Sequence, residues 1–117
     1  MDPFTRRRVG QILDGYIQLK VPRQVRDSVR LTYKTEGNRL TLTEHRPSAD
    51  RRGWSGTDIV QFRLDGKRWT VFTSTGPDEW SLVESIRPAE DFEQQLEQVE
   101  LDHEGLFWNP DLSSEQV

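Results

Sequence analysis

The stretch IVQFRLDGKRWTVFT, residues 59–73, decides the fold of this chain. Apolar and polar side chains alternate on both sides of Asp65-Gly66, and an Asp-Gly pair between two alternating runs is a strong signal for a tight β-hairpin turn. Along the first run Val60 and Phe62 share one face of the strand, and Ile59 takes the other. The stretch therefore predicts two antiparallel strands joined by a short turn.

The same alternation continues on both sides of this hairpin. Upstream, residues 29–34 alternate apolar with polar, a turn signal follows at residues 36–38, and leucines alternate again over residues 40–42. A polar loop at residues 47–56 leads back to the hairpin. Downstream, residues 75–78 form another turn before a fifth strand marked by two more apolar positions, which are Trp80 and Leu82. Five strands with mostly short connections predict an antiparallel meander.

Helices flank these strands. Asp2 is a good N-cap, and Pro3 fits the first helical position, where its missing N–H costs nothing. An apolar stripe at helical spacing then predicts a helix over residues 2–19, although Gly10 and Gly15 each cost about 1 kcal/mol relative to Ala. Tertiary packing must therefore hold this helix. A short turn or helix is expected after Pro22, with Val25 pointing inward.

The C-terminal part also predicts a helix. An apolar seam with spacings of three, four and three consists of Ala89, Phe92, Leu96 and Val99. Gly105 is the expected C-terminal stop, and residues 106–108 are apolar enough to dock on the core. The fold class is therefore α+β: a single domain over residues 1–108, with an antiparallel sheet of about five strands and both terminal helices packed on one face. Residues 109–117 are expected to be a disordered tail.

Composition excludes several classes of protein. The chain has 117 residues, 32% hydrophobic and 31% charged, and no cysteine. Disulfide scaffolds, thiolate metal sites and cysteine nucleophiles are therefore excluded. No apolar run approaches the roughly 20 residues of a membrane span, and no signal-peptide pattern opens the sequence. We expect a cytoplasmic protein that does not act on a membrane.

Charge is distributed very unevenly. All 16 Lys and Arg lie in residues 1–87, where 11 acids leave a net charge of +5. Residues 88–117 hold the other nine acids and no Lys or Arg, which gives −9 and a total of −4. Because most late acids belong to the predicted C-terminal helix, we expect them to complement the basic part of the same domain.

Six motifs follow one another along the chain: Leu31-x-Tyr33, Leu42-x-Glu44-x-Arg46-Pro47, Phe62-Arg63, Trp69-x-Val71, Asp78-Glu79-Trp80 and Asp102-x-x-Gly105-x-Phe107-Trp108. Their order and spacing resemble those of a bacterial family known as domain of unknown function 3024. The resemblance covers about residues 4–108. Two positions depart from the pattern: Ser81 stands where relatives often carry His, and Asn109 where Gly is usual. The family has no established activity, so the resemblance supports the layout and implies no chemistry.

Catalytic and metal-binding patterns are not found in the sequence. A metal site needs roughly three protein ligands, and the chain has two histidines, His45 and His103. There is no nucleophile-elbow, zinc-protease or phosphate-loop motif. We therefore expect no metal and no cofactor, and the sequence leans away from an enzyme. The enzyme alternative is a small active site built from Glu44, Arg46, Asp78 and His103.

A second alternative is weak binding of nucleic acid. The basic residues that could contact phosphates are Arg6, Arg7, Arg8, Arg23, Arg26, Arg51 and Arg52. Trp54 could stack on a base. Against this, acids interrupt the basic segments, and the sequence pI is about 5.2, whereas nucleic-acid-binding domains commonly exceed about 9.

The leading hypothesis is a non-catalytic binding or interaction module. Trp54 lies in a polar loop beside two arginines, and Trp and Arg are enriched where interfaces bind most strongly. The ring could instead fold back over the sheet with arginine stems packed on it. Trp69 and Trp80 are expected in the core. Two helices on one side would leave the other sheet face open as a contact surface; it would carry Arg63, Arg68, Thr70 and Phe72.

A protein partner or a second copy would bind at this sheet face or at the Trp54 loop. The candidate binding residues are Glu44, Arg46, Arg51, Arg52, Trp54, Arg63, Asp78 and Trp80.

Overall fold

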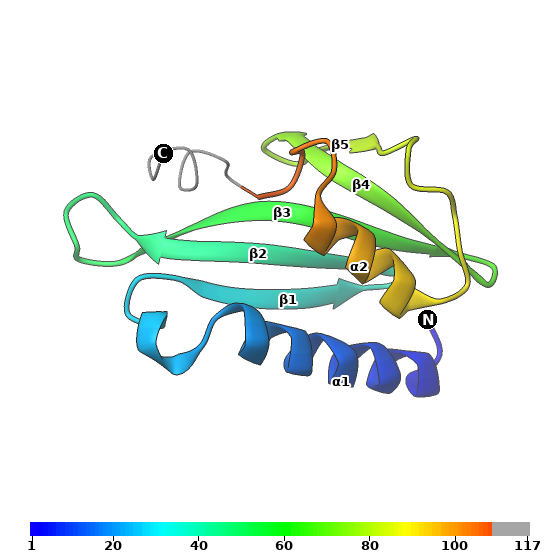
Figure 1. The fold of residues 1–117 in the computed structure, drawn as a ribbon, viewed down its shortest axis with the longest axis horizontal. Helices are drawn as coiled ribbons and strands as arrows, with labels where there is room; N and C mark the ends of the chain where they lie inside the picture. Colours follow the sequence, from blue (N-terminus) through cyan, green and yellow to red (C-terminus); the bar gives the residue numbers. More distant parts are fainter. Residues whose placement is uncertain (109–117) are drawn as a thin grey trace.

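A five-stranded antiparallel sheet runs through the centre of the molecule in a computed structural model that describes residues 1–108 (Figure 1). The strands lie in chain order, which confirms the predicted meander. They are β1 (Arg30–Glu36), β2 (Arg39–Pro47), β3 (Trp54–Asp65), β4 (Arg68–Gly76) and β5 (Glu79–Leu82). Gly37 and Gly66 adopt φ values of +60° and +64° in two of the turns, a conformation that glycine reaches without steric cost.

The N-terminal helix, α1 (Pro3–Lys20), begins where the sequence predicts. The Asp2 carboxylate accepts a 2.7 Å hydrogen bond from the Thr5 amide, and Pro3 occupies the first turn. Packing explains the glycine at position 10, because a Cβ there would lie 3.0 Å from the Tyr33 hydroxyl. The same hydroxyl donates to the Gly10 carbonyl at 3.5 Å. This close approach to β1 offsets the cost of a glycine inside the helix.

The C-terminal helix, α2 (Phe92–Leu101), is shorter than predicted at both ends. Ala89 lies before the helix and pairs with Trp69 in an isolated β-bridge, while Asp91 is the N-cap. The stop predicted at Gly105 is wrong. Asp102 ends the helix in the left-handed conformation, φ 45°, which Asp tolerates because its short side chain can bind nearby backbone.

Asp102 also fixes the segment that follows α2. Its carboxylate accepts hydrogen bonds from the amides of Leu106 at 2.7 Å and Trp108 at 3.1 Å. Phe107 is buried, and the Trp108 indole donates to the Val99 carbonyl at 3.2 Å. The predicted docking of this segment is confirmed, with Leu106 its most exposed apolar member. The predicted disordered tail at residues 109–117 lies outside the described residues.

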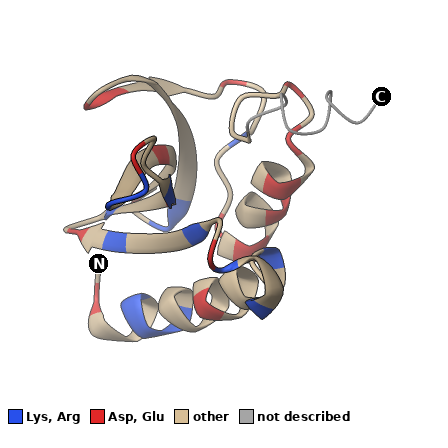
Figure 2. Ribbon diagram, turned by 90° about the vertical axis from the view of Figure 1, so that its left-hand side faces the viewer, with Lys and Arg blue, Asp and Glu red and all other residues tan. Residues whose placement is uncertain are grey.

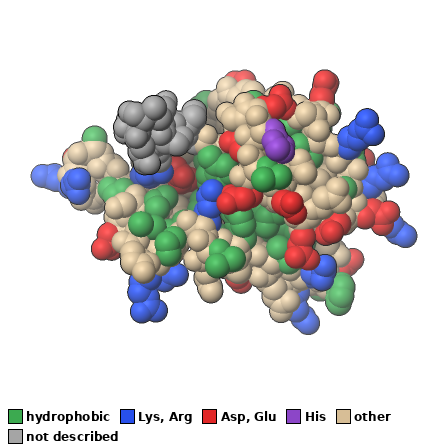
Figure 3. All heavy atoms as spheres, viewed as in Figure 1, with side chains coloured by type: hydrophobic (Ala, Val, Ile, Leu, Met, Phe, Trp, Pro, Cys, Tyr) green, Lys and Arg blue, Asp and Glu red, His purple; other side chains and the backbone are tan. Residues whose placement is uncertain are grey.

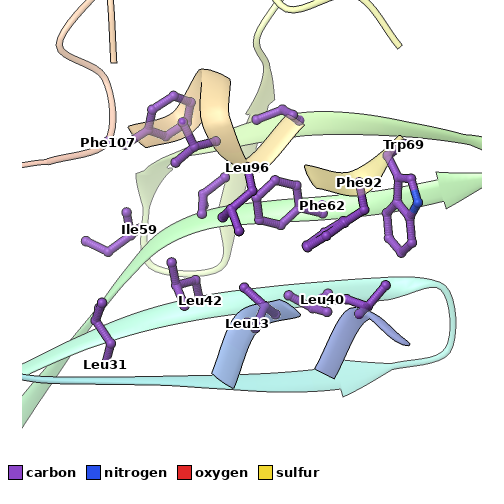
Figure 4. Close-up of a cluster of buried hydrophobic side chains, with 14 of the residues drawn as sticks. Leu13, Leu31, Leu40, Leu42, Ile59, Phe62, Trp69, Phe92, Leu96 and Phe107 are labelled. Atoms are coloured by element: carbon purple, nitrogen blue, oxygen red, sulfur yellow. The ribbon is translucent and has the colours of Figure 1, made fainter. Parts of the chain in front are cut away.

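Both helices cover the same face of the sheet, and the core lies between them and the strands (Figure 4). Phe92 of α2 packs edge-on against Phe62, at 4.8 Å between ring centroids, and against Trp69 at 5.0 Å. Leu13 of α1 is fully buried in the same cluster. Each such side chain contributes about 1.5–3 kcal/mol by leaving water. The α+β layout is therefore as predicted.

Two predictions about which side chains face the core were wrong. Ile59 belongs to the core together with Val60, because a β-bulge lies where the β2–β3 register shifts between Leu42 and Thr43. A bulge places two residues opposite one, so the alternation is lost at that point. Val25, in the short 3-10 helix η1 (Arg23–Val25), is 39% exposed. A single turn is too short to bury an apolar stripe, so its apolar residue does not reach the core.

Candidate functional site

The sheet face that points away from both helices, called the open face below, is largely polar. Strand register assigns its side chains, because successive residues of a strand point to opposite faces. The main ones are Arg30, Thr32, Lys34, Glu36, Arg39, Thr41, Thr43, His45, Asp58, Gln61, Arg63, Arg68, Thr70, Phe72, Trp80 and Leu82. The predicted open surface of Arg63, Arg68, Thr70 and Phe72 is part of this set. The other members of the set lie on β1, β2, β3 and β5.

The open face is concave. A cleft of about 410 Å³ is lined by Lys34 and Glu36 of β1 and also by Trp80 of β5, although these strands are the two outer strands of the sheet. The sheet must therefore curl, and Figure 2 shows the hairpin of β4 and β5 bending round on the side away from α2. The remaining lining residues, Arg39, Thr41, Asp58, Gln61 and Asp78, complete a mostly polar wall.

Two irregularities in strand pairing account for the curl. One is the bulge at Ile59, and the other is a register shift between Ser74 and Gly76 where β4 pairs with β5. Bulges bend the strand that carries them and increase the local twist. The β4–β5 turn holds Asp78 in the left-handed conformation, φ 58°, at the rim of the cleft.

Buried polar side chains form the floor of the open face. Thr41 is 3% exposed and Gln61 is 6% exposed, which is unusual for polar residues on a face without a covering helix. The Gln61 amide donates to the Thr41 hydroxyl at 3.0 Å, and its carbonyl oxygen accepts from Arg63 Nε at 2.6 Å. The Phe72 ring lies under the Arg63 guanidinium, 3.8 Å from its centroid. Arg63 is therefore held from two sides.

Arg63 experiences an unfavourable electrostatic environment for a cation. Its pKa is lowered from the usual arginine value, first by desolvation and second by the positive charge of Arg39. The register places Arg39 directly opposite Arg63 on β2. Like charges opposite each other on one sheet face destabilise the pair of strands. Within residues 1–108, no carboxylate lies within 4.0 Å of either guanidinium.

The acids on this face are tied to neighbours instead. Asp58 accepts a 2.9 Å hydrogen bond from the Thr43 hydroxyl, and Glu36 pairs with Lys34 at 3.4 Å. Trp80 is half-buried on the open face, so the prediction that it belongs to the core is wrong. Alternation indicates which residues share a face, but it does not indicate which face the helices cover, and this explains the error.

Trp54 lies at the far end of the same open face. The ring is 39% exposed, and the Arg30 guanidinium of β1 stacks on it at 3.9 Å. An arginine does pack on the ring, as one alternative predicted, but it comes from another strand and not from the loop. Arg51 and Arg52 are exposed in the β2–β3 loop, where the Arg52 amide donates to Asp50 at 3.0 Å. Hydrogen bonds from Ser48 and Arg52 lower the pKa of Asp50.

Glu44 and Arg46 lie on the opposite, helix-covered face. Their side chains form an ion pair at 3.0 Å, with the Glu44 side chain 15% exposed. His45 points to the open face, where its Nε2 is 2.8 Å from the Thr32 hydroxyl. His103 lines a separate small apolar pocket beside the end of α2.

The four candidates of the enzyme alternative therefore do not meet. The Glu44–Arg46 ion pair, the Asp78 turn and the His103 pocket are three separate places. No group of three or more metal-ligating side chains occurs among the described residues.

Sequence reasoning missed six residues of the cleft: Lys34, Glu36, Arg39, Thr41, Asp58 and Gln61. Thr41 and Gln61 share the open side of their strands with Arg39 and Arg63, so their phase in the alternation was a usable signal. The curl that gathers them with Trp80 depends on the bulge, which has no marker in the alternating pattern.

The helix side carries the acidic residues of α2. Lys20 pairs with Glu100 at 2.8 Å, Tyr16 donates to the same carboxylate at 2.8 Å, and Arg8 pairs with Glu93 at 3.4 Å. The predicted complementarity between basic and acidic parts is therefore confirmed at these contacts. Figure 3 shows acidic side chains around an apolar strip on this side.

Fold and site together define a small α+β domain in which two helices cover one face of a curled meander sheet and a polar cleft occupies the other. The chain belongs to the family DUF3024, described as a domain of unknown function, whose model matches residues 1–109. This confirms the resemblance found in the sequence. No curated protein and no solved structure matches the chain. Among residues 1–108, no helix is long and apolar enough to cross a membrane.

Proposed function

We propose that this protein is a non-catalytic binding module whose working surface is the open face of the sheet. The carrying observation is that Asp78 and Trp80, chosen from the sequence, line one concave cleft with Arg39 and Gln61. Polar groups held in fixed positions in a concave site can set the orientation of what binds there. The Trp54 end of the same face extends this surface along β3.

The partner in this proposal is a protein, either another chain or a second copy. The cleft walls carry both signs of charge, with Lys34 and Arg39 beside Glu36, Asp58 and Asp78. Mixed charge with an exposed Trp suits a protein surface, because it fixes register and excludes wrong partners. A nucleic-acid backbone would instead require a continuous basic track.

Arg39→Glu tests this proposal, with Arg7→Glu as the matched control. Both arginines are exposed and both changes reverse one charge, but Arg7 lies on α1 and not on the open face. Each variant is compared with the wild type by quantitative affinity capture from a lysate of the source cells and by sedimentation velocity. We expect Arg39→Glu to lose a captured protein or the dimer, and Arg7→Glu to retain it. A monomer whose captured proteins are the same for all three chains would contradict the proposal.

A further inference from the structure

We infer that Arg39 and Arg63, called the arginine pair below, form a subsite that receives a single oxyanion, a carboxylate or a phosphate, from the ligand of the open face. This inference rests on the proposed function, since it names the chemistry that the open face recognises. It is carried by three features: the placement of two cations together, the fixed orientation of one of them, and the carboxylates that surround them.

The placement sets two cations beside each other, and Glu36, which lies opposite Arg39 on β1, pairs with Lys34 at 3.4 Å instead. Arg39 and Arg63 are direct cross-strand neighbours on β2 and β3, and their side chains leave the same side of the sheet. Like charges directly opposite each other on one sheet face weaken the pairing of the strands. Within the described part of the chain, the four ion pairs involve neither arginine. An oxyanion between the two guanidiniums would remove this repulsion.

The orientation of Arg63 leaves its binding end free. Phe72 supports one face of the guanidinium, and Nε donates to Gln61, which is itself held by the Thr41 hydroxyl. In residues 1–108, the two terminal amino groups of Arg63 donate no hydrogen bond to another side chain or to the backbone. Those two groups form the fork that binds carboxylate or phosphate oxygens in pairs. A guanidinium fixed in advance loses less conformational entropy on binding.

The electrostatic environment agrees with this geometry. Desolvation and the charge of Arg39 both lower the pKa of Arg63, so a bound anion would shift that pKa back upward. The guanidinium stays charged near neutral pH in either case, because the ordinary arginine pKa lies far above 7. Anion binding is therefore expected without a change of protonation.

The surrounding acids limit the ligand to one oxyanion. Glu36, Asp58 and Asp78 line the cleft that Arg39 shares, so a second negative group would meet carboxylates. A polyanion such as a nucleic-acid strand would bring several phosphates into this region and be repelled. One anionic side chain on a protein partner, acidic or phosphorylated, satisfies the arginine pair and leaves the acids free to accept hydrogen bonds from neighbouring donors.

The test uses the full chain and two small probes, sodium acetate and inorganic phosphate, at low ionic strength. Titrations are followed by the NMR resonances of the arginine Nε–H groups. The variants are Arg63→Gln and Arg39→Gln, and the matched control is Arg30→Gln, which removes an arginine from the far end of the same open face. Thermal unfolding establishes that each variant is folded, and Arg39, which is exposed, provides the test if Arg63→Gln does not fold.

We expect saturable shifts of the Arg39 and Arg63 resonances with a Kd below about 10 mM for one probe. In each pair variant the resonance of the remaining arginine should report binding at least tenfold weaker, and in Arg30→Gln both resonances should report a change of less than twofold. Tighter binding of acetate indicates an acidic side chain as the source, and tighter binding of phosphate a phosphorylated one. The absence of saturation with either probe, or equal weakening in Arg30→Gln, overturns the inference. A single-stranded oligonucleotide that binds more tightly than phosphate through the same pair also overturns it, in favour of nucleic acid.

This outcome is separable from that of the proposed function. Loss of partner capture in Arg39→Glu without binding of a free anion would leave the open face as the working surface and reject the oxyanion subsite. Anion binding at the arginine pair with unchanged partner capture in Arg39→Glu would support the oxyanion subsite and reject the open face as the surface that binds the captured protein.

Discussion

Replacing Gln95 by leucine should destabilise the domain by about 2 kcal/mol. The Gln95 side chain is 1% exposed, and its amide donates to the carbonyls of Trp69 at 2.8 Å and Arg87 at 2.9 Å. Leucine has a similar volume but no donor. Trp69 keeps a hydrogen bond from the Ala89 amide at 3.2 Å, whereas the Arg87 carbonyl loses the bond from Gln95. One lost hydrogen bond and one unsatisfied acceptor cost about 1 kcal/mol each.

Urea denaturation followed by tryptophan fluorescence measures this loss. With a slope of about 1–3 kcal/mol per M, the midpoint should fall by roughly 1 M. Gln94→Leu is the control, since Gln94 is exposed on the same helix and should change stability by less than about 0.5 kcal/mol. A Gln95→Leu midpoint within error of the Gln94→Leu midpoint would refute the reasoning that Gln95 joins α2 to β4 and to the segment before the helix.

Three further predictions concern the helix ends and the contact between helices. Tyr16→Phe removes the hydrogen bond to Glu100 and should cost about 1 kcal/mol. Burial and Glu100 raise the pKa of Tyr16 in the folded state, so its contribution to stability is full below the ordinary Tyr pKa of about 10 and declines as the pH rises above it. Thermal scans from pH 8 to 11 should therefore show a smaller fall in melting temperature for Tyr16→Phe than for the wild type. Asp102→Ala should cost about 2 kcal/mol in urea denaturation, and Asp102→Asn much less, since Asn keeps both the left-handed conformation and an acceptor. The Thr5 amide lowers the pKa of Asp2, so the stabilisation is present above the ordinary Asp pKa of about 4 and is lost as the pH falls below it; Asp2→Ala should therefore narrow the difference between melting temperatures at pH 7 and pH 3.

Local signals predicted most of the fold. Asp65-Gly66 marked a hairpin through a left-handed turn, and Asp2 with Pro3 marked the start of α1, because each signal depends on residues close in the sequence. The end of α2 was mispredicted for the same reason. Gly105 is the residue that most readily adopts the left-handed conformation, but Asp102 adopts it three residues earlier, where its carboxylate binds the amides of the docked segment.

The candidate site was predicted only in part, because it depends on curvature. The sequence indicated that Arg63 and Phe72 share a face, and the register confirms this placement. The sequence did not indicate that Trp80 lies on the open face and outside the core, nor that residues of β1 and β5 line one cleft. Both follow from the bulge at Ile59 and the shift beyond Ser74, where the pairing of distant residues overrides alternation.

Site-specific photo-crosslinking tests the central claim, that the open face is the working surface, most directly. A photoreactive amino acid replaces Lys34 in one variant and Gln18 in a second variant. Lys34 lines the open-face cleft, whereas Gln18 lies on α1. Both chains are irradiated in the source cells and their adducts compared. The account predicts a discrete adduct, either with a partner or with a second copy, from position 34 and none from position 18. An adduct from position 18 alone would contradict it and move the working surface to the helix side.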